Sequence, residues 1–122
     1  MVLIKDNHIE AAGGVSSAIR TALANPLTSN LPIEVEVKNE NELYEALDFP
    51  LTRILLDNMT LDQMRAAVNI TAGRVPLEAS GNMSLERVRA VAETGVNYIS
   101  VGALTHSAPA LDLSMKLSKI TG

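Results

Sequence analysis

Two carboxylates stand at the ends of neighbouring short apolar runs in this sequence. Glu36 lies near the end of the run 33–37, and Asp57 directly follows the run 54–56. Carboxylate oxygens are preferred ligands of Mg²⁺, so two such groups from adjacent strands could share one Mg²⁺ ion. The alternative is that either acid pairs with Lys5 or caps a turn.

Two turns of small polar residues follow later apolar runs. Ser80, Gly81 and Asn82 precede a predicted helix, and backbone N–H groups before a helix N-terminus can bind phosphate. The alternative is a plain strand-to-helix turn with an N-cap. Gly102 begins the turn that contains His106, and adjacent late turns of a barrel often bind one phosphate together. His106 alone could equally be a surface or capping histidine.

Lys5 ends the first apolar run of the chain. An ammonium group at the end of a buried strand is costly without a counter-charge, so Lys5 either meets an anionic ligand or pairs with Asp6 or a neighbouring acid. Asn7 and His8 are expected to organise the following loop. Arg53 precedes the third run, at the end of that strand away from the predicted ligand.

The apolar runs must position these residues. They are short and β-branched or leucine-rich, which is typical of strands covered on both faces in a parallel sheet. They span residues 1–4, 33–37, 54–56, 75–79 and 98–101.

Amphipathic helices are predicted between the runs, at 15–24, 39–47, 60–73 and 84–95. Asn39 with Glu42, and Thr60 with Gln63, have the spacing of capping boxes. Gly73 is expected to cap the third helix. Alternating strands and helices predict a parallel α/β sheet, whose ligands bind at the carboxyl ends of the strands.

The last residues show a different pattern. Apolar and polar residues alternate from 111 to 118, which predicts a final strand with one solvated face, possibly on another sheet. A short helix is the alternative. We therefore divide the chain into a partial (β/α) barrel at 1–110 and a C-terminal strand or tail at 111–122.

Composition excludes several classes of function. The 122 residues carry a formal net charge of -4, which argues against a nucleic-acid groove, and no cysteine is present for disulfides or thiolate metal sites. No apolar run approaches the roughly 20 residues of a membrane span. The first residues lack a signal-peptide pattern, so a cytoplasmic location is expected.

Five motifs, in this order, are similar to those of the quinolinate phosphoribosyltransferase family, also called nicotinate-nucleotide pyrophosphorylases (carboxylating). They are LIKDNHI at 3–9, EVEV at 34–37, ILLDNM at 54–59, LEASGN at 77–82 and ISVGALTHSA at 99–108. The resemblance runs from residue 1 to about residue 117. It implies the C-terminal portion of a TIM-like phosphoribosyltransferase barrel.

The resemblance also implies an activity. Family members transfer phosphoribosyl from phosphoribosyl pyrophosphate to quinolinate with decarboxylation, which gives nicotinate mononucleotide, CO₂ and pyrophosphate in de novo NAD biosynthesis. Lys5 matches the family lysine that contacts the quinolinate carboxylates. Glu36 and Asp57 match the acids that hold Mg²⁺ and the ribose hydroxyls. Further matches to the substrate site, mainly to the seat of the 5′-phosphate, are Ser80, Gly81, Asn82, Gly102 and His106.

The chain is short for this family. A complete barrel needs about 250 residues, and the family's additional N-terminal domain and earlier strands supply arginines and a histidine that bind quinolinate. We expect catalysis only in a full-length chain, which by resemblance forms a homo-oligomer, a dimer or larger, with a shared site. One alternative is a truncated, non-catalytic module that binds Mg²⁺ and a sugar phosphate. Another is a structural half-barrel whose loop residues only cap helices.

Overall fold

A single mainly parallel sheet organises the chain. The computed structural model describes residues 1–81 and 83–101 and the backbone of 113–116. The strands lie side by side in sequence order. They are β1 (Val2–Ile4), β2 (Ile33–Val37), β3 (Arg53–Asp57), β4 (Leu77–Ser80), β5 (Tyr98–Val101) and β6 (Leu113–Lys116). β1 to β5 are parallel, and β6 pairs antiparallel with β5.

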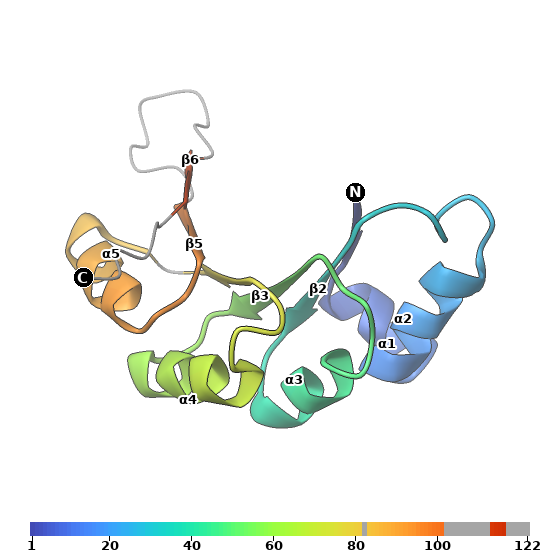
Figure 1. Cartoon of the computed structure of the whole chain (residues 1–122), viewed down its shortest axis with the longest axis horizontal. Helices are drawn as coiled ribbons and strands as arrows, with labels where there is room; N and C mark the ends of the chain where they lie inside the picture. Colours follow the sequence, from blue (N-terminus) through green and yellow to red (C-terminus); the bar gives the residue numbers. More distant parts are fainter. Residues whose placement is uncertain (82, 102–112, 117–122) are drawn as a thin grey trace.

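The described helices all lie on the outer side of the curved sheet (Figure 1). They are α1 (Asp6–Ala12), α2 (Val15–Ala24), α3 (Glu40–Ala46), α4 (Leu61–Thr71) and α5 (Leu85–Glu93). They connect each parallel strand to the next, as in a (β/α) barrel opened along one side. The predicted α/β class and partial parallel barrel are confirmed.

The hydrophobic core lies between the sheet and these helices. Val35, Ile54, Leu56, Ala79 and Ile99 point toward the helices and are fully buried. Because strand residues alternate between faces, the residues between them face the inner side of the curve. The prediction of strands covered on both faces is therefore met on one face only, and the inner face carries charged residues.

The predicted strands and helices are confirmed, and their caps mostly so. Thr60 and Gln63 form a complete capping box, with N···O distances of 3.1 and 2.8 Å. Asn39 accepts the Glu42 N–H at 2.9 Å, but the Glu42 carboxylate accepts the Lys38 N–H. The box at Asn39 is therefore only half formed.

One helix was not predicted, and the cap of another differs from the prediction. The segment expected as a loop after Lys5 is helix α1, and His8 stabilises its first turn because its Nδ1 accepts the Lys5 N–H at 3.1 Å. Helix α4 ends at Thr71, and its C-cap is Ala72, which has a left-handed conformation at φ 51°, one residue before the expected cap at Gly73.

The final strand is confirmed over 113–116, so the alternative of a helix is wrong there. It extends the same sheet rather than forming a second one. The division into domains at residue 110 stays a prediction.

Candidate functional site

The carboxyl ends of β1 to β4 bring four of the predicted site residues to one edge of the sheet. Lys5 follows Ile4, whose register partner is Val35, so Lys5 lies beside Glu36. Asp57 ends β3 and is paired in register with Ser80, the last residue of β4. Residues that are far apart in the sequence thus share one edge because consecutive parallel strands are neighbours.

The surroundings of Glu36 at this edge disfavour its charged form. Partial burial raises the pKa of its carboxyl, and the charge of Asp57 raises it further. The Lys5 ammonium and a hydrogen bond from the Asp6 backbone lower the pKa, but the net shift is upward. A carboxylate whose ionisation is opposed by a neighbouring acid favours a cation beside it.

A second ammonium group lies at the same edge. Lys38 directly follows β2, and its Nζ is 2.6 Å from Asp6 Oδ1, with both side chains about half exposed. This contact, through its hydrogen bond first, raises the pKa of Lys38. Asp6 therefore makes its ion pair with Lys38, not with Lys5 as one alternative held. Sequence reasoning missed Lys38, although its position after a strand was a usable signal.

The turn after β4 is packed tightly against the turn after β3. Asn58 N–H donates to the Ser80 carbonyl at 3.0 Å. Gly81 has φ +116°, and a Cβ built there would lie only 2.6 Å from Asn58 Oδ1. Glycine is therefore required for this close approach, which places the predicted phosphate turn directly beside the strand end that carries Asp57.

Helix α5 begins just after this turn. Ser84 is its N-cap and accepts the Arg87 N–H at 3.1 Å. Arg87 in turn donates from Nη2 to the Met59 carbonyl at 2.7 Å, which ties α5 to the loop after β3. The positive end of α5 thus faces the same edge as the acids. Three further predicted site residues, Asn82, Gly102 and His106, lie outside the described residues.

The described residues fit a Mg²⁺ ion bound by two carboxylates. No cluster of three or more Asp, Glu, His or Cys side chains capable of holding a metal occurs among them. Mg²⁺ is commonly bound by one or two carboxylates, with waters and substrate phosphates completing the octahedron. Glu36 and Asp57, two carboxylates near the ends of adjacent strands, match that pattern.

The described cavities do not contain these residues. One of about 530 Å³ lies between β1, α1 and α2 and is mostly apolar, and one of about 350 Å³ lies between α3 and α4. The candidate site is thus an open strand edge. None of the described helices has the length and apolarity needed to cross a membrane.

The curved parallel sheet, with all its described helices on the outer side (Figure 1), defines part of a (β/α) barrel. Acids lie at two of its central strand ends, and a glycine turn precedes a helix beside them. The family model for the C-terminal domain of quinolinate phosphoribosyl transferase matches residues 1–116. The chain belongs to the quinolinate phosphoribosyltransferase family.

Relatives in plants agree with this assignment. "Quinolinate phosphoribosyltransferase [decarboxylating] 1" of Nicotiana glauca is 45% identical, with 96% of this chain and 38% of the relative covered. "Nicotinate-nucleotide pyrophosphorylase [carboxylating], chloroplastic" of Oryza sativa subsp. japonica is 42% identical, with 96% and 36% covered.

A bacterial structure agrees as well. The nicotinate-nucleotide pyrophosphorylase structure from Francisella tularensis superposes with a TM-score of 0.79 at 43% identity, over 91% of this chain and 39% of that one. The chain thus spans less than two fifths of the length of these relatives.

Proposed function

We propose that this chain forms the C-terminal barrel portion of a quinolinate phosphoribosyltransferase. The reaction is phosphoribosyl transfer from phosphoribosyl pyrophosphate to quinolinate, followed by decarboxylation to nicotinate mononucleotide. The supporting observation is that Lys5, Glu36, Asp57 and the Gly81 turn meet at one strand edge in a chain of this family. Because the chain spans about two fifths of the length of its relatives, we assign the activity to a full-length polypeptide that contains it.

Each residue in this proposal binds or orients rather than reacting covalently. The Lys5 ammonium holds a quinolinate carboxylate, and Glu36 and Asp57 hold the ribose hydroxyls and would coordinate Mg²⁺. When bound, Mg²⁺ supplies positive charge that stabilises the departing pyrophosphate. The N–H groups of the Ser80–Gly81 turn and the positive end of α5 bind the 5′-phosphate. We propose that the same phosphate is also bound by Asn82, Gly102 and His106.

The chemistry suits such a site. The ring nitrogen forms a bond to the ribose carbon as the bond to pyrophosphate breaks, so positioning and electrostatics supply most of the catalysis. The ring 2-carboxylate then leaves as CO₂, and the electron pair stays on the ring carbon beside the cationic nitrogen until a proton is added. No covalent nucleophile from the protein is needed.

The full-length enzyme is proposed to be a homo-oligomer, a dimer or larger, located in the cytoplasm. Names of plant relatives include "mitochondrial" and "chloroplastic", so compartment varies within the family. Fractionation of the source cells, followed by native mass determination of the soluble enzyme, tests both statements.

Formation of nicotinate mononucleotide by the full-length polypeptide tests the proposed activity. We expect Asp57→Asn and Glu36→Gln each to lower kcat/KM about 100-fold or more, with a higher Mg²⁺ requirement. Asp62→Asn is the matched control, because Asp62 is an exposed residue of α4 that pairs with Arg65. Equal activity of Asp57→Asn and Asp62→Asn would contradict the assignment.

The alternative of a non-catalytic module is supported by one observation. In the part of the chain that the structure describes, Lys5 and Lys38 are the lysines at the candidate edge, which is little positive charge for a dicarboxylate and a pyrophosphate. Titration of the 122-residue chain with phosphoribosyl pyrophosphate and Mg²⁺ separates the two interpretations. Binding without turnover, in both this chain and the full-length protein, would favour the module.

A further inference from the structure

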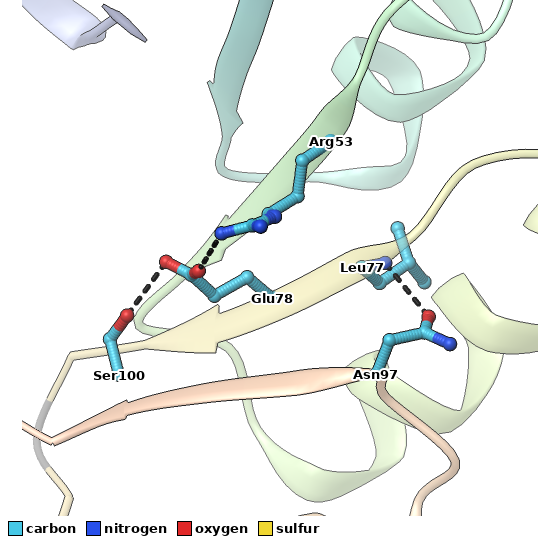
Figure 2. A network of polar contacts seen from close by, with 5 residues as sticks. All are labelled: Arg53, Leu77, Glu78, Asn97 and Ser100. Atoms are coloured by element: carbon cyan, nitrogen blue, oxygen red, sulfur yellow. Dashed lines mark hydrogen bonds and ion pairs between the residues drawn. The ribbon is translucent and has the colours of Figure 1, made fainter. Parts of the chain in front are cut away.

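A buried carboxylate joins three strands just below the candidate phosphate turn. Glu78, in the middle of β4, accepts a hydrogen bond from Arg53 Nη1 of β3 at 2.8 Å and one from Ser100 Oγ of β5 at 2.6 Å (Figure 2). Glu78 is only 7% exposed. Its two carboxylate oxygens are thus engaged on opposite sides, one toward each neighbouring strand.

The backbone pairing of β4 with β5 is short, and side-chain hydrogen bonds add to it on both sides. The register partners are Glu78 with Tyr98 and Ala79 with Ile99. Below them, Leu77 N–H donates to Asn97 Oδ1 at 2.9 Å (Figure 2). Asn97 N–H also donates to the Leu77 carbonyl at 2.9 Å. Above them, toward the site, the hydrogen bond from Ser100 to Glu78 connects β5 to β4 through side chains.

Arg53 is held in place by more than its ion pair. Its guanidinium carbon lies 4.0 Å from the centre of the Tyr98 ring, a cation–π contact. Glu34, its register partner on β2, also acts on this network, because the charges of Glu78 and Arg53 both influence the pKa of its carboxyl. Arg53 is therefore a fixed partner for Glu78, and Glu78 cannot move without breaking a charged contact.

We infer that Glu78 is a positioning residue that sets the spacing between the Ser80–Gly81 turn and the end of β3 that carries Asp57. Ser80 and Gly81 follow Glu78 by two and three residues, and Asp57 follows Arg53, the ion-pair partner of Glu78, by four residues. A carboxylate held between Arg53 and Ser100 therefore fixes β4 against both neighbouring strands just before the turn begins. This inference rests on the proposed function, since it concerns the 5′-phosphate seat of that reaction.

Steady-state kinetics of the full-length enzyme test this role. Glu78→Gln keeps the shape and an acceptor for Ser100 but removes the charge that orders Arg53. We expect the KM for phosphoribosyl pyrophosphate to rise roughly tenfold, as for the loss of one charged hydrogen bond, while the KM for quinolinate changes by less than about twofold. Ser100→Ala should raise the same KM, and Ser100→Thr, which keeps the hydroxyl, should restore it. Asp62→Asn should alter neither KM.

The outcomes are distinguishable. A residue with a merely structural role would lower the unfolding midpoint and leave the ratio of the two KM values unchanged, and that result would overturn the inference. If Glu78→Gln does not fold, Ser100→Ala and Ser100→Thr decide, because an equal KM for both variants would also overturn it. An inactive wild-type enzyme would instead remove the proposed function on which the inference depends.

Discussion

Replacement of Gly81 by alanine should lower both the stability of the protein and its affinity for phosphate, because the added methyl group destabilises the turn in two ways. The first is conformational, since the residue has φ +116°, which L-amino acids rarely adopt. The second is steric, since the new Cβ would lie 2.6 Å from Asn58 Oδ1 and 3.0 Å from Asn58 Cα. Asn58 cannot simply retreat, because its backbone N–H is bonded to the Ser80 carbonyl.

The magnitude follows from these two costs. A residue held in a sparsely populated backbone region costs about 1–3 kcal/mol, and overpacking a tight contact costs a similar amount, about 1–3 kcal/mol. We therefore expect Gly81→Ala to lower the free energy of unfolding by about 3 kcal/mol. Relief of the clash would separate the turn from Asn58, so the affinity for phosphoribosyl pyrophosphate should fall as well.

Gly73→Ala is the matched control. Gly73 also has a positive φ, +77°, but a Cβ added there would meet no atom within 4 Å, and the residue follows α4 away from the site. This variant should lose only about 1 kcal/mol, the cost of a left-handed conformation. Urea unfolding of both variants measures the difference. Equal losses for Gly81→Ala and Gly73→Ala, with unchanged ligand affinity, would refute the steric argument.

Three further predictions concern buried charge and helix capping. Burial first, and the charge of Glu78 second, raise the pKa of the Glu34 carboxyl above its ordinary value of 4.5. The folded state therefore binds a proton more tightly than the unfolded state does, and stability falls as the pH rises from the unfolded pKa through the higher folded pKa. Glu34→Gln should therefore be more stable than wild type at about pH 7.5 but not at about pH 4, by urea unfolding at both pH values. Arg53→Ala should lower the free energy of unfolding by about 2–3 kcal/mol in the same assay, because it leaves the buried Glu78 carboxylate without its cationic partner. The loss is limited because Arg53 itself is partly exposed. Thr60→Ala should cost about 1 kcal/mol in thermal unfolding, and a loss equal to that of a surface threonine would contradict its role in the box with Gln63.

The sequence was informative wherever one local pattern decided the structure. Apolar runs separated by amphipathic stretches predicted β1 to β5 and α2 to α5, since strand and helix periodicity differ clearly in such segments. Helix α1 was missed because the polar run after Lys5 resembles a loop. Its first turn is completed by a histidine side chain, which is not among the usual capping groups.

The sequence predicted those site residues whose positions follow from the strand order alone. Once the strands are parallel and consecutive, the positions of Lys5, Glu36 and Asp57 after or near the strand ends follow directly. Lys38 was overlooked, and its contact with Asp6 depends on α1, which was not predicted.

The Glu78 network was not predictable, because register and side-chain direction create it. Arg53 was correctly expected at the start of β3, away from the ligand. A long side chain on the inner face nevertheless reaches the middle of β4, where Glu78 lies 25 residues further along the chain. No sequence spacing indicates that contact, and only the pairing of β3 with β4 defines it.

This network connects the strands that carry the candidate site residues. β3 ends in Asp57 and begins with Arg53, while β4 ends in Ser80 and carries Glu78. The ion pair between Arg53 and Glu78 thus holds the strand that ends in Asp57 against the strand that leads to the proposed phosphate turn, and Ser100 adds β5 to them. Substitutions in the network should therefore change stability and phosphate affinity together. A substitution at Asp57 should instead lower ligand affinity without a loss of stability, because its side chain is only partly buried and its charge opposes that of Glu36.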